Sequence, residues 1–229
     1  MFDWAIIVKY LPILSEAALL TLYISVISLV LGLVFGLAAA LARLSRNRLF
    51  YGIASFYIWL IRSTPLLVQL FLIYYGLSQF PAIRSSFLWP ILREPYWCAI
   101  IAFALNTSGY TAEILRGAIQ AVPRGQIEAA QALGMSRALT FRRIILPIAI
   151  RYGFPAYSNE VILMIKASAL ASTITILDLM GVTRTLISRT FAVTELFLAA
   201  GVIYLVITLL LTRVFARVEA RLNRHMARR

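Results

Sequence analysis

The sequence has few of the residues that catalytic and metal sites use most. Its single cysteine, Cys98, excludes an internal disulfide, and with one histidine, His225, it cannot supply the ligands of a zinc site. Ser-His-Asp and HExxH arrangements are absent for the same reason. Only two lysines are present, Lys9 and Lys166, and neither lies in a G-x4-G-K-[ST] loop. We therefore expect no metal site, no bound cofactor and no catalytic residues in this chain.

Charged residues are also scarce. They make up 14% of the 229 residues, against roughly a quarter in soluble domains, whereas 62% of the residues are hydrophobic and the mean hydropathy is +0.87. The longest uncharged run, 17–42, has 26 residues, more than the roughly 20 that a spanning helix needs. The composition predicts an all-α integral membrane protein with one transmembrane domain over residues 1–229.

The hydrophobic runs predict five membrane spans. We place them at 11–42, 56–80, 96–116, 153–174 and 195–213. Ser63-Thr64-Pro65 also has the pattern of a helix start, so the second span could equally begin near Thr64, with 49–62 as a separate helix. An odd number of spans places the two termini on opposite sides of the membrane.

The formal net charge of +13 is explained by where the basic residues lie. Sixteen arginines flank the spans on one side, against five basic residues on the other. The sixteen are Arg43, Arg46, Arg48, Arg62, Arg116, Arg124, Arg137, Arg142, Arg143, Arg151, Arg213, Arg217, Arg221, Arg224, Arg228 and Arg229. The positive-inside rule then predicts a cytoplasmic C-terminus and an external N-terminus, and anionic lipids rather than nucleic acid as the partner of these charges.

The loop over 123–147 contains the segment EAAQALGMSRALTFRRIILP. Its residues 126–133 have good helix propensity, Gly134 interrupts them, and Ser136 can cap a second helix. An alanine-rich helix outside the bilayer fits as a small knob in a groove of another protein. An ordinary loop between two spans fits equally well on physical grounds.

The spacing EAA-x3-G-x10-ILP, from Glu128 to Pro147, resembles the EAA loop of permease subunits of ABC importers. Three further stretches are similar to the permeases for polar amino acids, although Ser63 stands where many relatives have glycine. These stretches are RSTPLLVQ (62–69), AVPRG (121–125) and YSNEVILM (157–164). The resemblance covers essentially the whole chain and is strongest to the permeases for histidine, lysine, arginine and ornithine, or for opines.

This resemblance implies a type I importer permease fold in a bacterial inner membrane. The first helix of the loop would be the coupling helix: Glu128 would contact an ATP-binding subunit, and Ala129, Ala130 and Gly134 would let the helix seat deeply. The implied partners are two ATP-binding subunits that hold ATP and magnesium, a homologous or identical permease subunit, and an extracytoplasmic amino-acid-binding protein.

Polar residues within the spans are the candidates for substrate contact, because ionisable groups at bilayer depth need a partner or water. Asn106, Tyr110 and Glu113 form one helical stripe, and Glu160 lies on the fourth span. Thr64 and Gln69 complete the set. Buried carboxylates favour cationic substrates. Glu113 could instead pair with Arg116 or a loop arginine. Glu160 could pair with Lys166 or with an arginine of a neighbouring subunit, although Lys166 lies on another face of the helix.

Three other functions remain open at this point. The same architecture could serve glutamine or an acidic amino acid, in which case Glu160 would be neutral to transport. An ATP-independent secondary transporter is another possibility, against which the EAA-like loop speaks. An intramembrane enzyme using Glu113 and Glu160 is the third. The residues do not decide the exact substrate, the role of Lys166, or whether two identical permease chains pair.

Overall fold

The computed structural model describes residues 2–223, and every regular element in that range is a helix, which confirms the all-α prediction. The expectations for Arg224, His225, Arg228 and Arg229 lie outside the described residues. The α-helices are α1 (Trp4–Arg43), α2 (Arg48–Ser63), α3 (Leu66–Phe71), α4 (Pro81–Arg84), α5 (Trp89–Leu92), α6 (Pro95–Gln120), α7 (Arg124–Ala132), α8 (Arg137–Thr140), α9 (Leu146–Ala167), α10 (Leu179–Thr190) and α11 (Val193–Leu222). Between them lie the π-helical turns η1 (Leu72–Gly76) and η3 (Phe141–Ile145), and the 3-10 helices η2 (Leu77–Gln79) and η4 (Ser168–Ile174).

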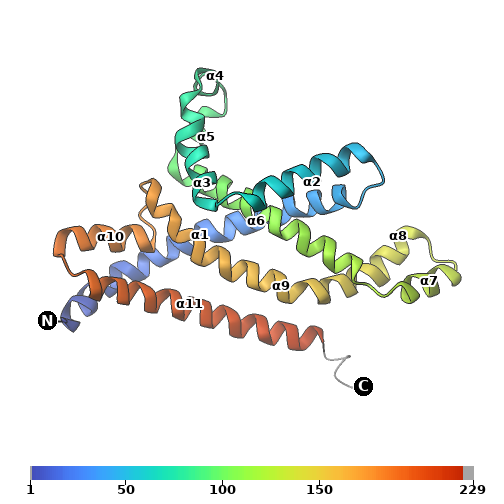
Figure 1. The fold of residues 1–229 in the computed structure, drawn as a ribbon. Coiled ribbons are helices and arrows are strands. Elements are labelled where there is room, and N and C mark those ends of the chain that lie inside the picture. The colour runs from blue at the N-terminus through green and yellow to red at the C-terminus, as the bar shows by residue number, and fades with distance from the viewer. Residues whose placement is uncertain (1, 224–229) are drawn as a thin grey trace.

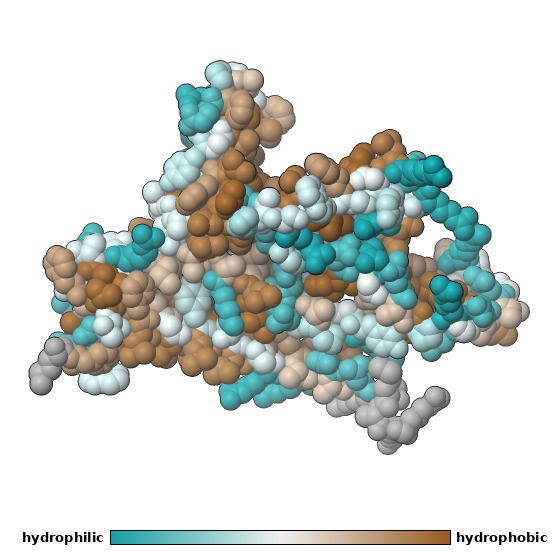
Figure 2. Space-filling view, viewed as in Figure 1, coloured by the Kyte–Doolittle hydropathy of each residue, from teal (hydrophilic) through white to brown (hydrophobic). Residues whose placement is uncertain are grey.

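Four long helices, α1, α6, α9 and α11, run side by side and form the body of the molecule (Figure 1). The α7–α8 hairpin lies at one end of this body, and α10 and the N-terminus lie at the other. Helices α3, α4 and α5 form an arm that stands out sideways. Hydrophobic residues cover most of this arm, whereas hydrophilic residues gather beside α2 and toward the α7–α8 end (Figure 2).

Three helices, α1, α6 and α11, are long and apolar enough to cross a bilayer. Two bent helix pairs raise the number to five within the described residues if each pair is one span. The predicted span 56–80 is not a straight helix: α2 ends at Ser63, and the chain turns by 105° before α3. The alternative start near Thr64 is therefore confirmed, because Pro65 cannot continue α2 and instead precedes α3.

Helices α1 and α6 make the closest contact in the body. A Cβ atom on Gly32 would overlap the Cγ2 methyl of Thr107, and one on Gly36 would lie 2.8 Å from Cβ of Thr111. Both threonines are fully buried. The two glycines, four residues apart, let the helix backbones approach closely, as small residues do in membrane helix pairs.

Candidate functional site

The break between α2 and α3 is held by buried polar side chains. Gln69 is buried, and its amide nitrogen donates to the Ile61 carbonyl at 2.8 Å and to Thr64 Oγ1 at 2.7 Å. Its amide oxygen accepts a hydrogen bond from Asn106 Nδ2 of α6 at 3.0 Å. Because Pro65 cannot donate a backbone hydrogen bond, Gln69 supplies a donor to a carbonyl at the end of α2. This network fixes the bend and ties it to α6.

One helix position further along α6, Thr107 contacts Glu160 of α9. The Thr107 hydroxyl donates to Glu160 Oε1 at 2.8 Å, and the glutamate is 8% exposed. Within residues 2–223, no lysine or arginine lies within ion-pair distance of this carboxylate. Lys166 is exposed and does not pair with it, as its place on the helix predicts.

A pocket of about 460 Å³ lies beside this region, between α2, α6 and the end of α1. Glu113 in its wall accepts a bifurcated hydrogen bond from Arg116 Nε, at 3.1 Å to each carboxylate oxygen, and a second bond from Nη2 at 2.7 Å. Arg43 Nε lies 3.9 Å from the same carboxylate. The predicted pairing of Glu113 with Arg116 is confirmed, so its charge is balanced within this chain.

The same pocket carries two features that the sequence analysis missed. The Arg62 guanidinium lies 5.4 Å from the Tyr110 ring centre, a cation–π distance, and Trp59 and Ser55 complete the wall. Arg62 is exposed. Its role could not be assigned earlier because it was counted among the topology-determining arginines.

Five of the six predicted contact residues lie on α6 or form a hydrogen bond to it, and the sixth, Thr64, bonds to Gln69. Asn106, Tyr110 and Glu113 belong to α6, while Gln69 and Glu160 are joined to it by hydrogen bonds. A further residue that was not predicted is Thr107, which directly follows Asn106. The predicted stripe of Asn106, Tyr110 and Glu113 covers one face of the helix, whereas Thr107 lies about 100° around the axis from Asn106, facing α1 and α9.

The loop after α6 has the predicted helix, break and second helix. Helix α7 ends beside Gly134, whose φ of 76° lies in the left-handed region, and Met135 N donates to the Ala130 carbonyl at 3.1 Å. This is a glycine-terminated helix end. Ser136 caps α8 by accepting a hydrogen bond from Leu139 N at 3.3 Å. Open space surrounds Gly134, so backbone conformation rather than close packing requires a glycine there.

Two faces of α7 differ. Ala130 packs against the rest of the chain and is only 4% exposed, whereas Glu128 and Ala129 are exposed. Leu133 is 83% exposed, an unusual state for a leucine at the end of a helix. The sequence analysis missed Leu133, although an apolar residue just before the glycine was visible in the segment. The exposed face of α7 thus combines Glu128, Ala129 and Leu133.

Comparisons with known proteins agree with these features. The family described as the inner membrane component of binding-protein-dependent transport systems matches residues 32–224. The nopaline transport system permease protein NocM of Agrobacterium fabrum is 51% identical over 99% of this chain and 95% of its own length. The octopine permease OccM of Rhizobium radiobacter is 50% identical, covering 95% of this chain and 89% of its own length.

A solved structure described as an amino acid ABC transporter with histidines has a TM-score of 0.88 and 38% identity. The alignment covers 96% of this chain and 99% of that one. The fold and the sites described above define a membrane permease subunit. This chain belongs to the family of inner membrane components of binding-protein-dependent transport systems.

Proposed function

We propose that this chain forms one half of the translocation path of an ATP-driven importer for basic amino acids or opines. Its partners would be a homologous or identical permease subunit, two ATP-binding subunits that hold ATP and magnesium, and an extracytoplasmic binding protein. The names of the two relatives, permeases for nopaline and for octopine, support this substrate class.

The observation that carries the proposal is the state of Glu160. It is buried and has Thr107 as its hydrogen-bond donor, and no cation of residues 2–223 is close enough to pair with it. A buried carboxylate without a counter-ion is costly. The guanidinium or ammonium group of a basic substrate would supply the missing charge as it passes.

The pocket beside α2 fits the other end of such a substrate. Arg62 is exposed on its wall, with Arg43 nearby, and an α-carboxylate pairs well with a guanidinium. Octopine and nopaline carry an arginine unit with additional carboxylates, so two arginines suit them. Thr64, Gln69 and Asn106 bond mainly to one another. In this proposal they hold the bend between α2 and α3 beside the translocation path, where the substrate can contact them.

The α7 helix would couple transport to ATP hydrolysis. Glu128, Ala129 and Leu133 form its exposed face, while Ala130 and Gly134 set how that face is presented. By the positive-inside rule, the arginines around this loop support a cytoplasmic position for it, and the N-terminus would then lie outside. ATP-driven movement of the partner subunits would then reach α6 and α9 directly, because the loop connects them.

The test uses the complete complex in lipid vesicles with its binding protein. Uptake of arginine, octopine and glutamine is measured for wild type and for Glu160→Gln. We expect arginine and octopine uptake to fall about 10- to 100-fold, the loss typical of one charged hydrogen bond, while any glutamine uptake is unchanged. Glu113→Gln is the matched control, because Glu113 is already paired with Arg116, and we expect no such selectivity change.

Other results have clear meanings. Equal loss for all three substrates would show that Glu160 holds the structure and does not select cations. Preference for glutamine in the wild type would support the alternative substrate class. Uptake that persists without ATP or a co-purified ATPase would contradict the importer proposal and support a secondary transporter.

A further inference from the structure

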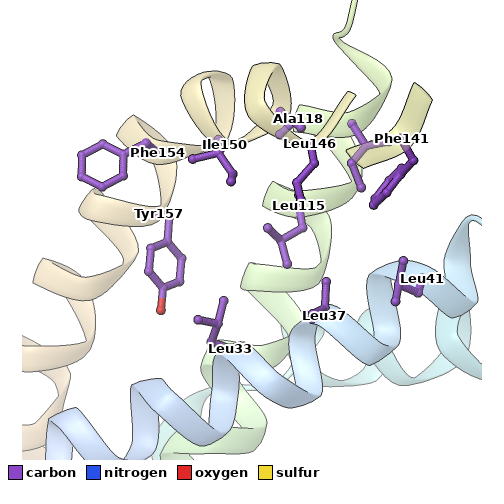
Figure 3. A pocket seen from close by; sticks show the side chains of 13 residues that line it. Leu33, Leu37, Leu41, Leu115, Ala118, Phe141, Leu146, Ile150, Phe154 and Tyr157 are labelled. Atoms are coloured by element: carbon purple, nitrogen blue, oxygen red, sulfur yellow. The ribbon is translucent and has the colours of Figure 1, made fainter. Parts of the chain in front are cut away.

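A second pocket, separate from the polar one, is lined by apolar side chains (Figure 3). Its volume is about 220 Å³. Leu33, Leu37 and Leu41 of α1 form one wall, Leu115 of α6 lies at the back, and α9 forms the other wall. The remaining lining residues are Ala118, Ile119, Phe141, Leu146, Ala149, Ile150, Gly153, Phe154 and Tyr157. None of the thirteen is charged, and the Tyr157 hydroxyl is the only polar side-chain group among them.

The pocket is a groove that runs along the helices. Its α1 residues extend over eight positions, about 12 Å, and its α9 residues, Leu146 to Tyr157, over eleven positions, about 16 Å. Because α1 is long and apolar enough to cross a bilayer, a groove along it would run across the membrane. Its volume equals that of roughly seven water molecules in the liquid, which is too small for a helix about 10 Å wide. A single hydrocarbon chain has both the required shape and the required polarity.

Charge marks one end of the groove. Phe141 lies at the end nearest the α7–α8 loop, and Arg142 and Arg143, the next two residues, are exposed. Arg46, shortly after Leu41 on the opposite wall, is also exposed. Exposed arginines that adjoin these lining residues in the sequence make this end of the apolar groove complementary to a lipid with an anionic headgroup.

We propose that this groove binds one acyl chain of an anionic phospholipid, from the leaflet on the side of the α7–α8 loop. The chain lies between α1 and α9 and ends at Tyr157, while the headgroup phosphate contacts Arg142 and Arg143. Tyr157 is three residues from Glu160 on the same helix. The lipid therefore supports the part of α9 that positions the buried carboxylate.

The test is a lipid count on the complete transport complex. Native mass spectrometry measures phosphatidylglycerol and phosphatidylcholine retained per copy of this chain after titration in detergent. We expect wild type to retain one phosphatidylglycerol that Leu37→Trp loses, with at least tenfold lower occupancy, because the indole fills the groove. Val34→Trp, an exposed α1 position that does not line the groove, is the matched control and should retain it.

A second pair of variants tests the headgroup. Arg142→Gln with Arg143→Gln should lower phosphatidylglycerol affinity roughly tenfold and leave phosphatidylcholine unchanged. Arg217→Gln with Arg221→Gln, on exposed positions of α11, should change neither. If Leu37→Trp gives too little complex, Ile150→Trp fills the groove from α9 and gives the same readout.

Three results would overturn the proposal. The first is equal phosphatidylglycerol retention by wild type, Leu37→Trp and Ile150→Trp. The second is retention of phosphatidylcholine at the same level as phosphatidylglycerol in the wild type. The third is efficient cross-linking of Leu37→Cys to the second permease subunit, which would show that protein covers the groove.

Discussion

The contact between Gly32 and Thr107 makes a sharp prediction, because one threonine serves two purposes. Its Cγ2 methyl packs against Gly32 of α1, and its hydroxyl donates to Glu160 of α9. A methyl group added in Gly32→Ala overlaps Cγ2 and lies 3.2 Å from the Ala104 carbonyl. The threonine must then move, which weakens its bond to the carboxylate.

The magnitude follows from three contributions. Overpacking in a tight core costs about 1–3 kcal/mol, and loss of a hydrogen bond to a charged group costs about 1.5–3 kcal/mol. Alanine favours a helix over glycine by about 1 kcal/mol. We expect Gly32→Ala to destabilise the protein by roughly 1.5–5 kcal/mol. The midpoint of thermal unfolding of the purified complex should fall, and arginine uptake should fall with it.

Thr107→Ser allows the same Gly32→Ala change to be measured in a chain that lacks the Cγ2 methyl. Serine lacks the Cγ2 methyl but keeps the hydroxyl for Glu160, so Gly32→Ala should cost less than about 1 kcal/mol when combined with it. Gly201→Ala is the control, since open space surrounds that helical glycine and the change should be neutral or slightly stabilising. If Gly32→Ala costs the same with threonine or serine at position 107, the proposed coupling through this methyl is wrong.

Three further predictions concern the bend and the loop. Gln69→Leu leaves the Ile61 carbonyl and Asn106 without this partner and should lower unfolding stability by about 1–3 kcal/mol, measured by the thermal midpoint. Gly134→Ala places a side chain at φ 76°, at a cost of about 1 kcal/mol or more. It should uncouple ATPase activity from uptake, whereas Gly125→Ala, in open space within α7, should not. Leu133→Ala should weaken co-purification of the ATP-binding subunits without changing the thermal midpoint, because this side chain is 83% exposed.

The parts of the fold that periodicity and composition could predict are the long helices and the α7–α8 loop. Gly134 and Ser136 act locally, through backbone conformation and capping, so their roles were visible in the sequence. The 105° turn was visible only as a possible helix start at Thr64, because Arg62-Ser63-Thr64-Pro65 is a short polar break between two apolar stretches and does not give an angle. The direction of the turn depends on Gln69 meeting Asn106, a tertiary contact that one sequence does not reveal.

The candidate site divides in the same way. A charged residue inside a span is conspicuous, and this drew attention to Glu113 and Glu160. Their difference is set by neighbours: Arg116 lies three residues from Glu113 and was foreseen as its partner. Thr107 is 53 positions from Glu160 in the chain, and threonine is too common in membrane helices to stand out. The glycines that admit Thr107 to the core were present in the sequence, but their partner helix was not identifiable.

The glycine contact between α1 and α6 also provides a fixed reference for kinetic measurements. If α1 and α6 slid along each other, Thr107 and Thr111 would no longer face Gly32 and Gly36 and would collide with α1. The spacing of this helix pair should therefore stay constant throughout a transport cycle. Spectroscopic labels placed on the lipid-exposed faces of α1 and α6 would then serve as an internal ruler. Distances from that ruler to labels on α2, α9 or α11 would report which helices move when ATP binds.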